Sequence, residues 1–328
     1  MRFYFQILLF LVALPAMFVS CNQCDKTSEQ KTSIDTEPTV VHNSIYHWRT
    51  TFALDSAERA FIECHNIDRI YIRMFDVAVE QHYETALPEI VPIATTRFVD
   101  TIPDNCEIVP VVYITLKALR SMWGKEAQYA NLIVERVKAM CSYNNCGKIK
   151  ELQLDCDWTQ TTKVNYTKLC SIVKDSLSKE NIALSITVRL HQLQEDPPPA
   201  NRAVLMLYNT GALKEFETHN SILDIKDVKP YVKPMTYPIP LSYAYPVFGW
   251  GVKFKDHEFV AIVSAQDSTE TDDEHIRIER ASYNEIVAVK ELVESNLGKP
   301  QGGNILYHLD NTQLQNYTIN EIDQILAF

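Results

Sequence analysis

The chain is poor in glycine: only eight of its 328 residues are glycine, and no Gly-rich loop follows the first predicted strand. A dinucleotide-binding sheet needs such a loop where its backbone approaches the phosphates. The folded part also lacks a Cys-x-x-Cys pair, which argues against a zinc cluster. Long basic runs are absent and the formal net charge is −11, which disfavours nucleic-acid binding. We therefore expect no cofactor, no metal and no nucleic-acid partner.

Long apolar runs are also missing after residue 20, so no later segment is predicted to span a membrane. The apolar run at residues 3–18 is shorter than a spanning helix, follows Arg2 and ends just before Cys21. These features predict a cleavable signal peptide over residues 1–20. Because Phe18-Val19-Ser20-Cys21 resembles a lipobox, with Phe in place of the usual Leu, we expect Cys21 to be lipidated. Ordinary cleavage nearby, with Cys21 unmodified, is the alternative.

Residues 22–43 are rich in Ser, Thr, Gln, Asp and Glu and lack apolar periodicity, which is typical of a flexible tether. We thus predict a signal peptide (1–20), a lipidated tether (21–43) and one folded domain (44–328). Loss of residues 1–20 removes one Arg and no acid, so the net charge becomes −12. Only Asp25 and Glu29 follow Cys21 closely, which favours an outer-membrane lipoprotein facing the periplasm over one on the cell surface. The lipid would be its only membrane contact.

Six cysteines fall in the folded part: Cys64, Cys106, Cys141, Cys146, Cys156 and Cys170. Export permits disulfides, and six cysteines allow fifteen pairings. Cys141 and Cys146 flank a short turn with two Asn residues and could form a bridge. The sequence does not choose among the pairings.

Strand-like and helical segments alternate over the roughly 285 residues after the tether, a length close to the ~250 residues of a (β/α)8 barrel. No linker divides this region and no repeat occurs in it. The predicted strands are 45–52, 69–76, 107–115, 148–157, 182–190, 203–208, about 245–252 and 304–309. Helices are predicted at 55–64, around 130–140, 166–177, 283–295 and 318–326. The alternation predicts parallel strands and an α/β fold, a single-domain (β/α)8 TIM barrel, with an open doubly wound sheet as the alternative.

The fourth predicted strand carries the strongest chemical signal. Its strict alternation places Leu152, Leu154 and Cys156 toward the helices and Glu151, Gln153, Asp155 and Asp157 toward the barrel interior. Asp155 and Asp157 would lie about 6.6 Å apart at the carboxyl end, where barrel enzymes keep their active sites. Such a pair can hold one proton and act as a general acid or base. The alternatives are that Asp157 caps the next helix and that Asp155 pairs with an arginine.

The same alternation predicts inward polar residues on two other strands. On the second strand these are Tyr71, Arg73 and Phe75, with Asp76 at the top, and on the fifth they are Ser185, Thr187, Arg189 and His191. Arg73 and Arg189 would then neutralise Asp155 or orient substrate hydroxyl groups. His191 is either a substrate-binding residue or a hydrogen-bonded structural one.

Further polar and aromatic residues lie near predicted strand ends. Tyr208 and Asn209 follow the sixth strand, and His308 and Asp310 lie at the eighth. Three tryptophans, Trp48, Trp158 and Trp250, fall in or just after predicted strands, where indole rings can stack on sugars. Packing in the core is the alternative for each tryptophan.

Four segments resemble a family of uncharacterised Bacteroidota lipoproteins that are similar to the TIM barrels of glycoside hydrolases. They are Tyr71–Asp76, Leu152–Thr159, Leu184–Gln192 and Met206–Gly211, and the resemblance spans roughly residues 45–310. It implies an acid/base carboxylate at the end of strand four, matched by Asp155 or Asp157, and a nucleophile at strand seven. Strand seven departs from this pattern, because Phe248-Gly249-Trp250-Gly251 contains no carboxylate.

Three hypotheses follow. The first is a glycoside hydrolase that uses Asp155 or Asp157 with Asp76 or Asp310 as the second carboxylate. The second is a metal-dependent hydrolase whose ion is held by strand-end residues, although no two histidines stand at ligand spacing; its ligands would be Asp155, Asp157, His191, His308 and Asp310. The third is a glycan-binding lipoprotein without catalysis. Carbohydrate is the expected partner, since aromatic rings at a pocket mouth stack on the apolar faces of sugars.

Overall fold

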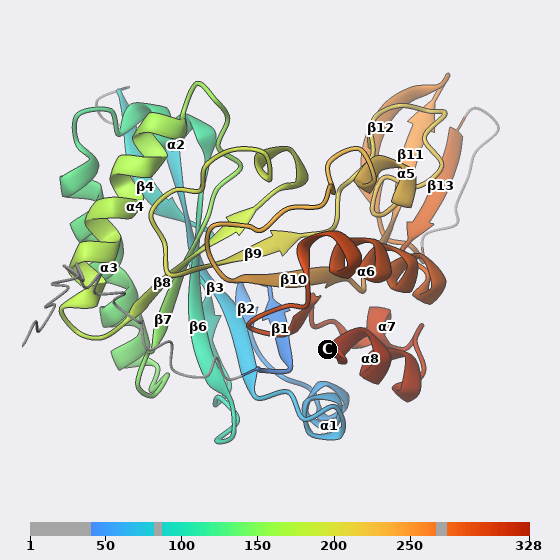
Figure 1. Ribbon diagram of the computed structural model, residues 1–328, viewed down its shortest axis with the longest axis horizontal. Coiled ribbons are helices and arrows are strands. Elements are labelled where there is room, and N and C mark those ends of the chain that lie inside the picture. Colours follow the sequence, from blue (N-terminus) through green and yellow to red (C-terminus); the bar gives the residue numbers. More distant parts are fainter. Residues whose placement is uncertain (1–40, 82–86, 267–273) are drawn as a thin grey trace, which may run out of the picture. The chain divides into compact units, whose positions relative to one another are not determined.

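Eight parallel strands close into a barrel (Figure 1). The computed structural model describes residues 41–81, 87–266 and 274–328. Each strand pairs with the next, and the last pairs with the first, which leaves the barrel without an open edge. In order around the barrel they are β1 (Ser44–His47), β3 (Arg69–Gln81), β6 (Glu107–Ile114), β7 (Glu151–Asp155), β8 (Ala183–Val188), β9 (Arg202–Met206), β10 (Leu241–Pro246) and β14 (Asn304–Tyr307). The predicted (β/α)8 barrel is confirmed.

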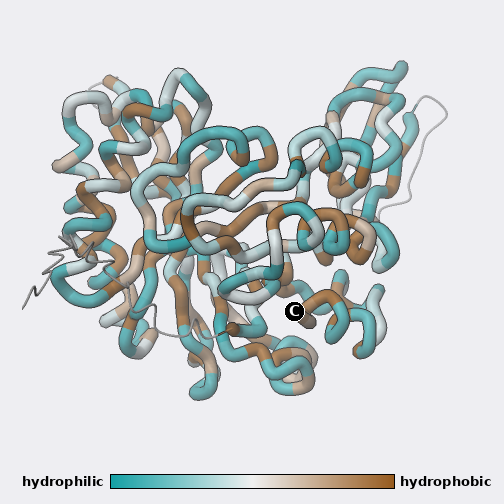
Figure 2. The backbone as a smooth tube through the Cα atoms, in the orientation of Figure 1, coloured by the Kyte–Doolittle hydropathy of each residue, from teal (hydrophilic) through white to brown (hydrophobic). Residues whose placement is uncertain are grey.

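Helices connect these strands and pack their apolar stripes against the barrel. Apolar residues are frequent along the barrel strands, as Figure 2 shows. Asp55 and Glu58 form a capping box at the start of the first helix. The helices are α1 (Ser56–Cys64), α2 (Leu116–Ser121), α3 (Glu126–Tyr143), α4 (Lys163–Ser178), α5 (Ile225–Val228), α6 (Tyr283–Leu297), α7 (Asn311–Leu314) and α8 (Ile319–Leu326).

Polar side chains fill the barrel interior in layers, as the alternation of the fourth strand predicts. In one layer the Tyr46 hydroxyl donates a hydrogen bond to Gln153 Oε1 at 2.7 Å, and Gln153 Nε2 donates one to Ser185 Oγ at 3.4 Å. In the layer above, Thr187 Oγ1 donates to Asp155 Oδ1 at 2.6 Å. Because buried polar groups need partners, these bonds fix the rotation of β7 and β8 about their axes.

A β-bulge in β3 changes which residues face inward. The register of β3 against β6 shifts between Arg73 and Phe75, so two residues of β3 advance where β6 advances one. Phe75 therefore points outward, where the guanidinium of Arg136 on α3 lies 5.1 Å from its ring centroid. The predicted inward orientation of Phe75 is wrong, because a bulge reverses the alternation beyond it.

The predicted seventh strand, 245–252, is divided between two strands that belong to different sheets. The barrel strand β10 ends at Pro246, and β11 (Gly249–Lys255) pairs antiparallel with β12 (Glu258–Val263) and β13 (Glu274–Arg280). This three-stranded sheet is drawn at the upper right of Figure 1. A Cβ on Gly251 would lie 2.8 Å from Val263 and 2.9 Å from Ile276, so the close packing of this sheet requires glycine there.

The predicted first strand, 45–52, is also divided. β1 ends at His47, and β2 (Thr51–Phe52) pairs with β5 (Arg97–Phe98) in a small separate sheet. A further strand, β4 (Pro88–Ile93), pairs antiparallel with the long carboxyl end of β3. β3 therefore extends beyond its predicted end.

The predicted signal peptide, Cys21 and residues 22–40 of the predicted tether lie outside the described residues. Within the described residues, every helix is too short or too polar to cross a bilayer. The described chain begins near the amino ends of the barrel strands, where the His42 amide donates a hydrogen bond to the Gly302 carbonyl.

Candidate functional site

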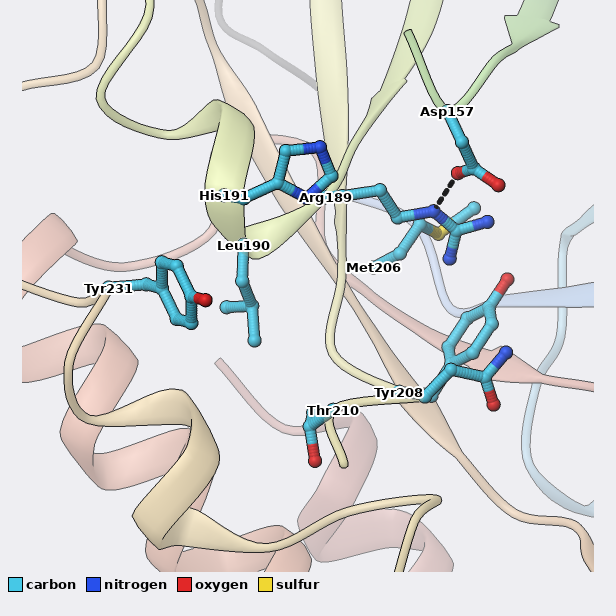
Figure 3. A pocket seen from close by; sticks show the side chains of 9 residues that line it. Asp157, Arg189, Leu190, His191, Met206, Tyr208, Thr210 and Tyr231 are labelled. Carbon is cyan, nitrogen blue, oxygen red and sulfur yellow. Dashed lines mark hydrogen bonds and ion pairs between the residues drawn. The ribbon is translucent and has the colours of Figure 1, made fainter. Parts of the chain in front are cut away.

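A cavity of about 350 Å³ lies at the carboxyl ends of β7, β8 and β9. The side chains that line it come from the segments that follow these strands (Figure 3). They are Asp157, Arg189, Leu190, His191, Met206, Tyr208, Asn209, Thr210 and Tyr231. The structure thus brings together five of the predicted site residues: Asp157, Arg189, His191, Tyr208 and Asn209.

Arg189 joins the two aspartates of the fourth strand. Its Nε donates a hydrogen bond to Asp157 Oδ1, drawn as a dashed line in Figure 3, and its Nη2 lies 4.0 Å from Asp155 Oδ1. The guanidinium also lies 5.2 Å from the ring centroid of Tyr208. Arg189 therefore has three partners, and its positive charge lies between the two carboxylates and the Tyr208 ring.

Asp155 lies below the cavity floor with an exposed fraction of 1%. Burial raises the pKa of its carboxyl, while the positive charge of Arg189 opposes this shift. The negative charges of Asp157 and Asp76 raise the pKa further. Asp155 is not among the residues that line the cavity, and its contacts are with Thr187 and Arg189.

Asp157 is the accessible carboxylate of the pair. Its side chain is 41% exposed and lines the cavity. It does not cap the next helix, because α4 begins at Lys163 and has Thr162 at its N-cap position. Asp157 is therefore available to a ligand, although its charge is already balanced by Arg189.

Arg73 pairs with Asp76 instead of Asp155. Its Nε donates a hydrogen bond to Asp76 Oδ1 at 2.7 Å, and its Nη2 binds the other oxygen. The bulge in β3 makes this pair possible, because three residues of regular strand would place the two side chains on opposite faces. The guanidinium lies 5.5 Å from the ring centroid of Trp48. The predicted neutralisation of Asp155 by Arg73 is wrong, whereas that by Arg189 has the expected geometry.

Asp310 and His308 lie outside the cavity lining. The Asp310 side chain caps α7 by accepting a hydrogen bond from the Thr312 amide at 2.9 Å. His308 lies against Phe248 with the ring planes 27° apart, and burial lowers the pKa of its imidazole. Asp310 is thus committed to a helix terminus, which does not suit the second carboxylate of a hydrolase.

Aromatic rings form a continuous row beside the cavity. Tyr208 stacks on Tyr307 with ring centroids 4.2 Å apart, and Tyr307 also contacts Trp48 at 5.7 Å. On the other side, Phe248 contacts Tyr307 at 5.8 Å and Trp250 at 5.2 Å. Trp48 and Trp250 are half-buried at the two ends of this row. Tyr208, Tyr307 and Phe248 are buried, so the two half-buried indoles are the members of the row with ring surface left for a sugar.

Trp158 does not belong to this row. It is 2% exposed, and the Lys163 ammonium lies 5.6 Å from its ring centroid. Trp158 does not line the cavity and belongs to the hydrophobic core, as the alternative of core packing predicts.

Tyr113 is a neighbour of the two buried aspartates that sequence reasoning missed. It lies on β6 in register with Asp76 on one side and Asp155 on the other, and its side chain is half-buried. Burial raises the pKa of its phenol to about 12, and the charges of Asp157 and Asp155 contribute. The sequence could have indicated this position, because Tyr113 lies near the end of the predicted strand 107–115. At two-residue spacing, its side chain lies on the same face of that strand as Val109 and Val111.

The residues of the metal-dependent hypothesis do not converge. Among residues 41–81, 87–266 and 274–328, no three His, Cys, Asp or Glu side chains come close enough together to hold an ion. His191 lines the cavity while His308 and Asp310 lie elsewhere. The described residues therefore do not assemble the site that this hypothesis requires.

Comparison of the sequence with family models and with curated proteins finds no match. The fold, in contrast, is similar to solved structures. The GH18 chitinase ChiB of Flavobacterium johnsoniae is 12% identical, with a TM-score of 0.52 over 88% of this chain and 94% of that one. The spore cortex-lytic enzyme SleL of Bacillus cereus is 13% identical, with a TM-score of 0.53 over 88% and 74%.

An Ostrinia furnacalis Group II chitinase domain, solved as an E2180L mutant in complex with a chitooligosaccharide, is 10% identical. Its TM-score is 0.50, over 87% of this chain and 96% of that one. At such low identities the likeness concerns the fold alone. The chain therefore has the barrel fold that these glycoside hydrolases share.

Proposed function

We propose that this chain is an exported lipoprotein of the Bacteroidota type that binds a glycan in the cavity at the carboxyl ends of β7, β8 and β9. The observation that carries the proposal is a cavity whose wall combines polar residues from three strands with the aromatic rings of Tyr208 and Tyr231. Aromatic faces pack against the C–H faces of sugars, and side chains such as His191 and Asn209 would bind their hydroxyl groups. The similar chitinase domain with bound chitooligosaccharide supports a glycan as the ligand.

Binding is favoured over hydrolysis because each candidate carboxylate already has a partner. Asp155 is buried against Thr187 and Arg189, and Asp76 is held by Arg73. Asp310 caps α7. None of these three carboxylates lines the cavity, whereas a general acid must lie within reach of the ligand.

Hydrolysis by Asp157 is the second candidate. Its side chain is the candidate carboxylate that both lines the cavity and is exposed to solvent. In substrate-assisted glycosidases, which include the GH18 family, catalysis does not follow the two-carboxylate scheme. One accessible carboxylate would then be compatible with a reaction.

A glycan screen of the full chain decides between the two. We expect N-acetylchitooligosaccharides or soluble peptidoglycan fragments to bind without release of new reducing ends. Tyr231→Ala, which removes an aromatic ring from the cavity wall, should weaken binding about tenfold. Affinity is measured by calorimetry and release by a reducing-end assay.

Tyr143→Ala is the matched control, because Tyr143 is 87% exposed at the end of α3 and does not line the cavity. Its affinity should equal that of the unmodified chain. Release of reducing ends that Asp157→Asn abolishes would establish hydrolysis instead of binding alone. Failure of every probe to bind would overturn the proposal.

We further propose that lipid on Cys21 anchors the protein to the outer membrane, facing the periplasm. Stable membrane anchoring needs more than one acyl chain, and a lipidated N-terminal Cys carries several acyl chains on one residue. The described chain enters the barrel at the end opposite the cavity, which would leave the cavity open to a glycan.

Replacement of the lipidation site tests this anchoring. Cys21→Ser should move the protein from the membrane fraction to the soluble fraction, because no described helix can span a bilayer. Cys64→Ser, a change at an exposed cysteine on α1, is the control and should stay with the membrane. Equal membrane retention of both variants would contradict lipidation of Cys21.

A further inference from the structure

Two cysteines at the end of α3 are placed side by side by a helix-capping turn. The Cys146 amide donates a hydrogen bond to the Cys141 carbonyl at 2.9 Å, and the Asn145 amide donates one to the Ser142 carbonyl at 3.4 Å. Asn145 between them has φ +52°. These bonds and the left-handed residue define a Schellman motif. In that motif the side chains at the positions of Cys141 and Cys146 characteristically contact each other.

Both thiols are buried at this turn: Cys141 is 2% exposed and Cys146 is 6% exposed. The interaction between the two side chains raises the pKa of the Cys141 thiol and lowers the pKa of the Cys146 thiol. Cys146 is therefore the better source of a thiolate, which is the nucleophile in thiol–disulfide exchange.

The other described cysteines are placed differently. Cys64 is exposed on α1, and the Cys106 thiol donates a hydrogen bond to the Ile67 carbonyl. Cys156 and Cys170 are both buried, and the Cys170 thiol shares a hydrogen bond with Tyr166. The Schellman turn therefore favours a bond between Cys141 and Cys146 in particular.

We propose that Cys141 and Cys146 form a disulfide that locks the Schellman turn between α3 and β7. Each thiol loses its proton, and the pair gives two electrons to a small-molecule disulfide donor, which leaves as two thiols. Formation in the cell rests on the proposed export, because a reducing cytosol would keep both thiols free. Formation in vitro depends only on the geometry of the turn.

Peptide mapping tests the pairing directly. The full chain, purified under reducing conditions, is incubated with oxidised glutathione, unfolded and alkylated. We expect the peptide that spans Cys141 and Cys146 to be two hydrogens lighter and unalkylated, and Cys156 and Cys170 to be alkylated. Alkylation of both Cys141 and Cys146, or a stable glutathione adduct on either, would overturn the proposal.

Thermal unfolding tests its effect on the fold. A disulfide that closes the short loop 141–146 should raise Tm. Reduction with dithiothreitol should therefore lower Tm by about 3–4 °C. The Cys141→Ser/Cys146→Ser variant should show no such shift, whereas Cys64→Ser should keep it. An equal shift in the double variant would show that another disulfide is responsible. Glycan binding is measured separately, so either proposal can fail without the other.

Discussion

Replacement of Arg189 by Gln should lower the free energy of unfolding by about 3–5 kcal/mol at pH 7. Arg189 is the cation beside Asp155, which is 1% exposed. Without it, Asp155 must either stay buried with an unbalanced charge or take up a proton. Both outcomes cost free energy at neutral pH, because removing one partner of a buried ion pair leaves the other without compensation.

The loss should depend on pH in a defined direction. Burial already raises the pKa of Asp155 in the folded protein, and removal of Arg189 raises this pKa further. An Asp in the unfolded chain has a pKa of about 3.9. At pH values between this pKa and the higher pKa of the folded variant, Asp155 is protonated in the folded state and ionised in the unfolded state. The stability deficit of the variant is therefore largest at pH 7 and shrinks as the pH falls toward about 4. Urea unfolding at pH 7 and at pH 4.5 measures both values.

Arg59→Gln is the matched control for this experiment. Arg59 pairs with Asp100, but the two side chains are 36% and 31% exposed, so solvent screens the pair and the expected loss is at most about 1 kcal/mol. Asp155→Asn combined with Arg189→Gln should recover part of the stability, since no buried charge then remains at this contact. Equal losses for Arg59→Gln and Arg189→Gln would contradict the assigned role of Arg189.

Gly303→Ala should destabilise the barrel by about 3 kcal/mol or more. Gly303 has φ +96°, and a Cβ added there would lie 2.2 Å from the His42 carbonyl oxygen. No rotation of a methyl group relieves this clash, so the backbone at the start of β14 or of β1 must move. Because these strands close the barrel, the movement would disturb the β1–β14 pairing.

Gly298→Ala separates the clash from the backbone strain. Gly298 has φ +89°, but a Cβ there would meet nothing within 4 Å. Because Gly298 has ψ 176° as well, this variant should lose only the cost of that nearly glycine-specific backbone conformation, about 1–3 kcal/mol. Urea unfolding should therefore show a clearly larger loss for Gly303→Ala than for Gly298→Ala. Equal losses would show that the approach of His42 does not constrain residue 303.

Much of the fold was predictable because its signals are local. Alternating apolar residues identify β7 and β8, and helical spacing identifies α3 and α4. Asp55 and Glu58 mark the start of α1 through a capping box. The position of Asp155, Asp157 and Arg189 at the carboxyl ends of neighbouring strands follows from the same alternation.

Other features depend on which strands meet. Residues 245–252 have strand-like composition throughout, but only the pairing partners separate β10 of the barrel from β11 of the added sheet. The bulge at Met74 leaves no mark in the residue types, yet it turns Phe75 outward and Asp76 toward Arg73. Alternation cannot reveal such a shift, because it assumes regular strands.

The sequence by itself determined the barrel, the inward face of its fourth strand and a set of polar residues at the strand ends. The tertiary structure decided which of these residues meet. It placed Asp157, Arg189 and Tyr208 in one cavity, buried Trp158, assigned Asp310 to a helix terminus and set Cys141 beside Cys146. The physical reason is range: periodicity and capping act between residues near in sequence, whereas ion pairs, ring stacking and burial depend on neighbours brought together by folding.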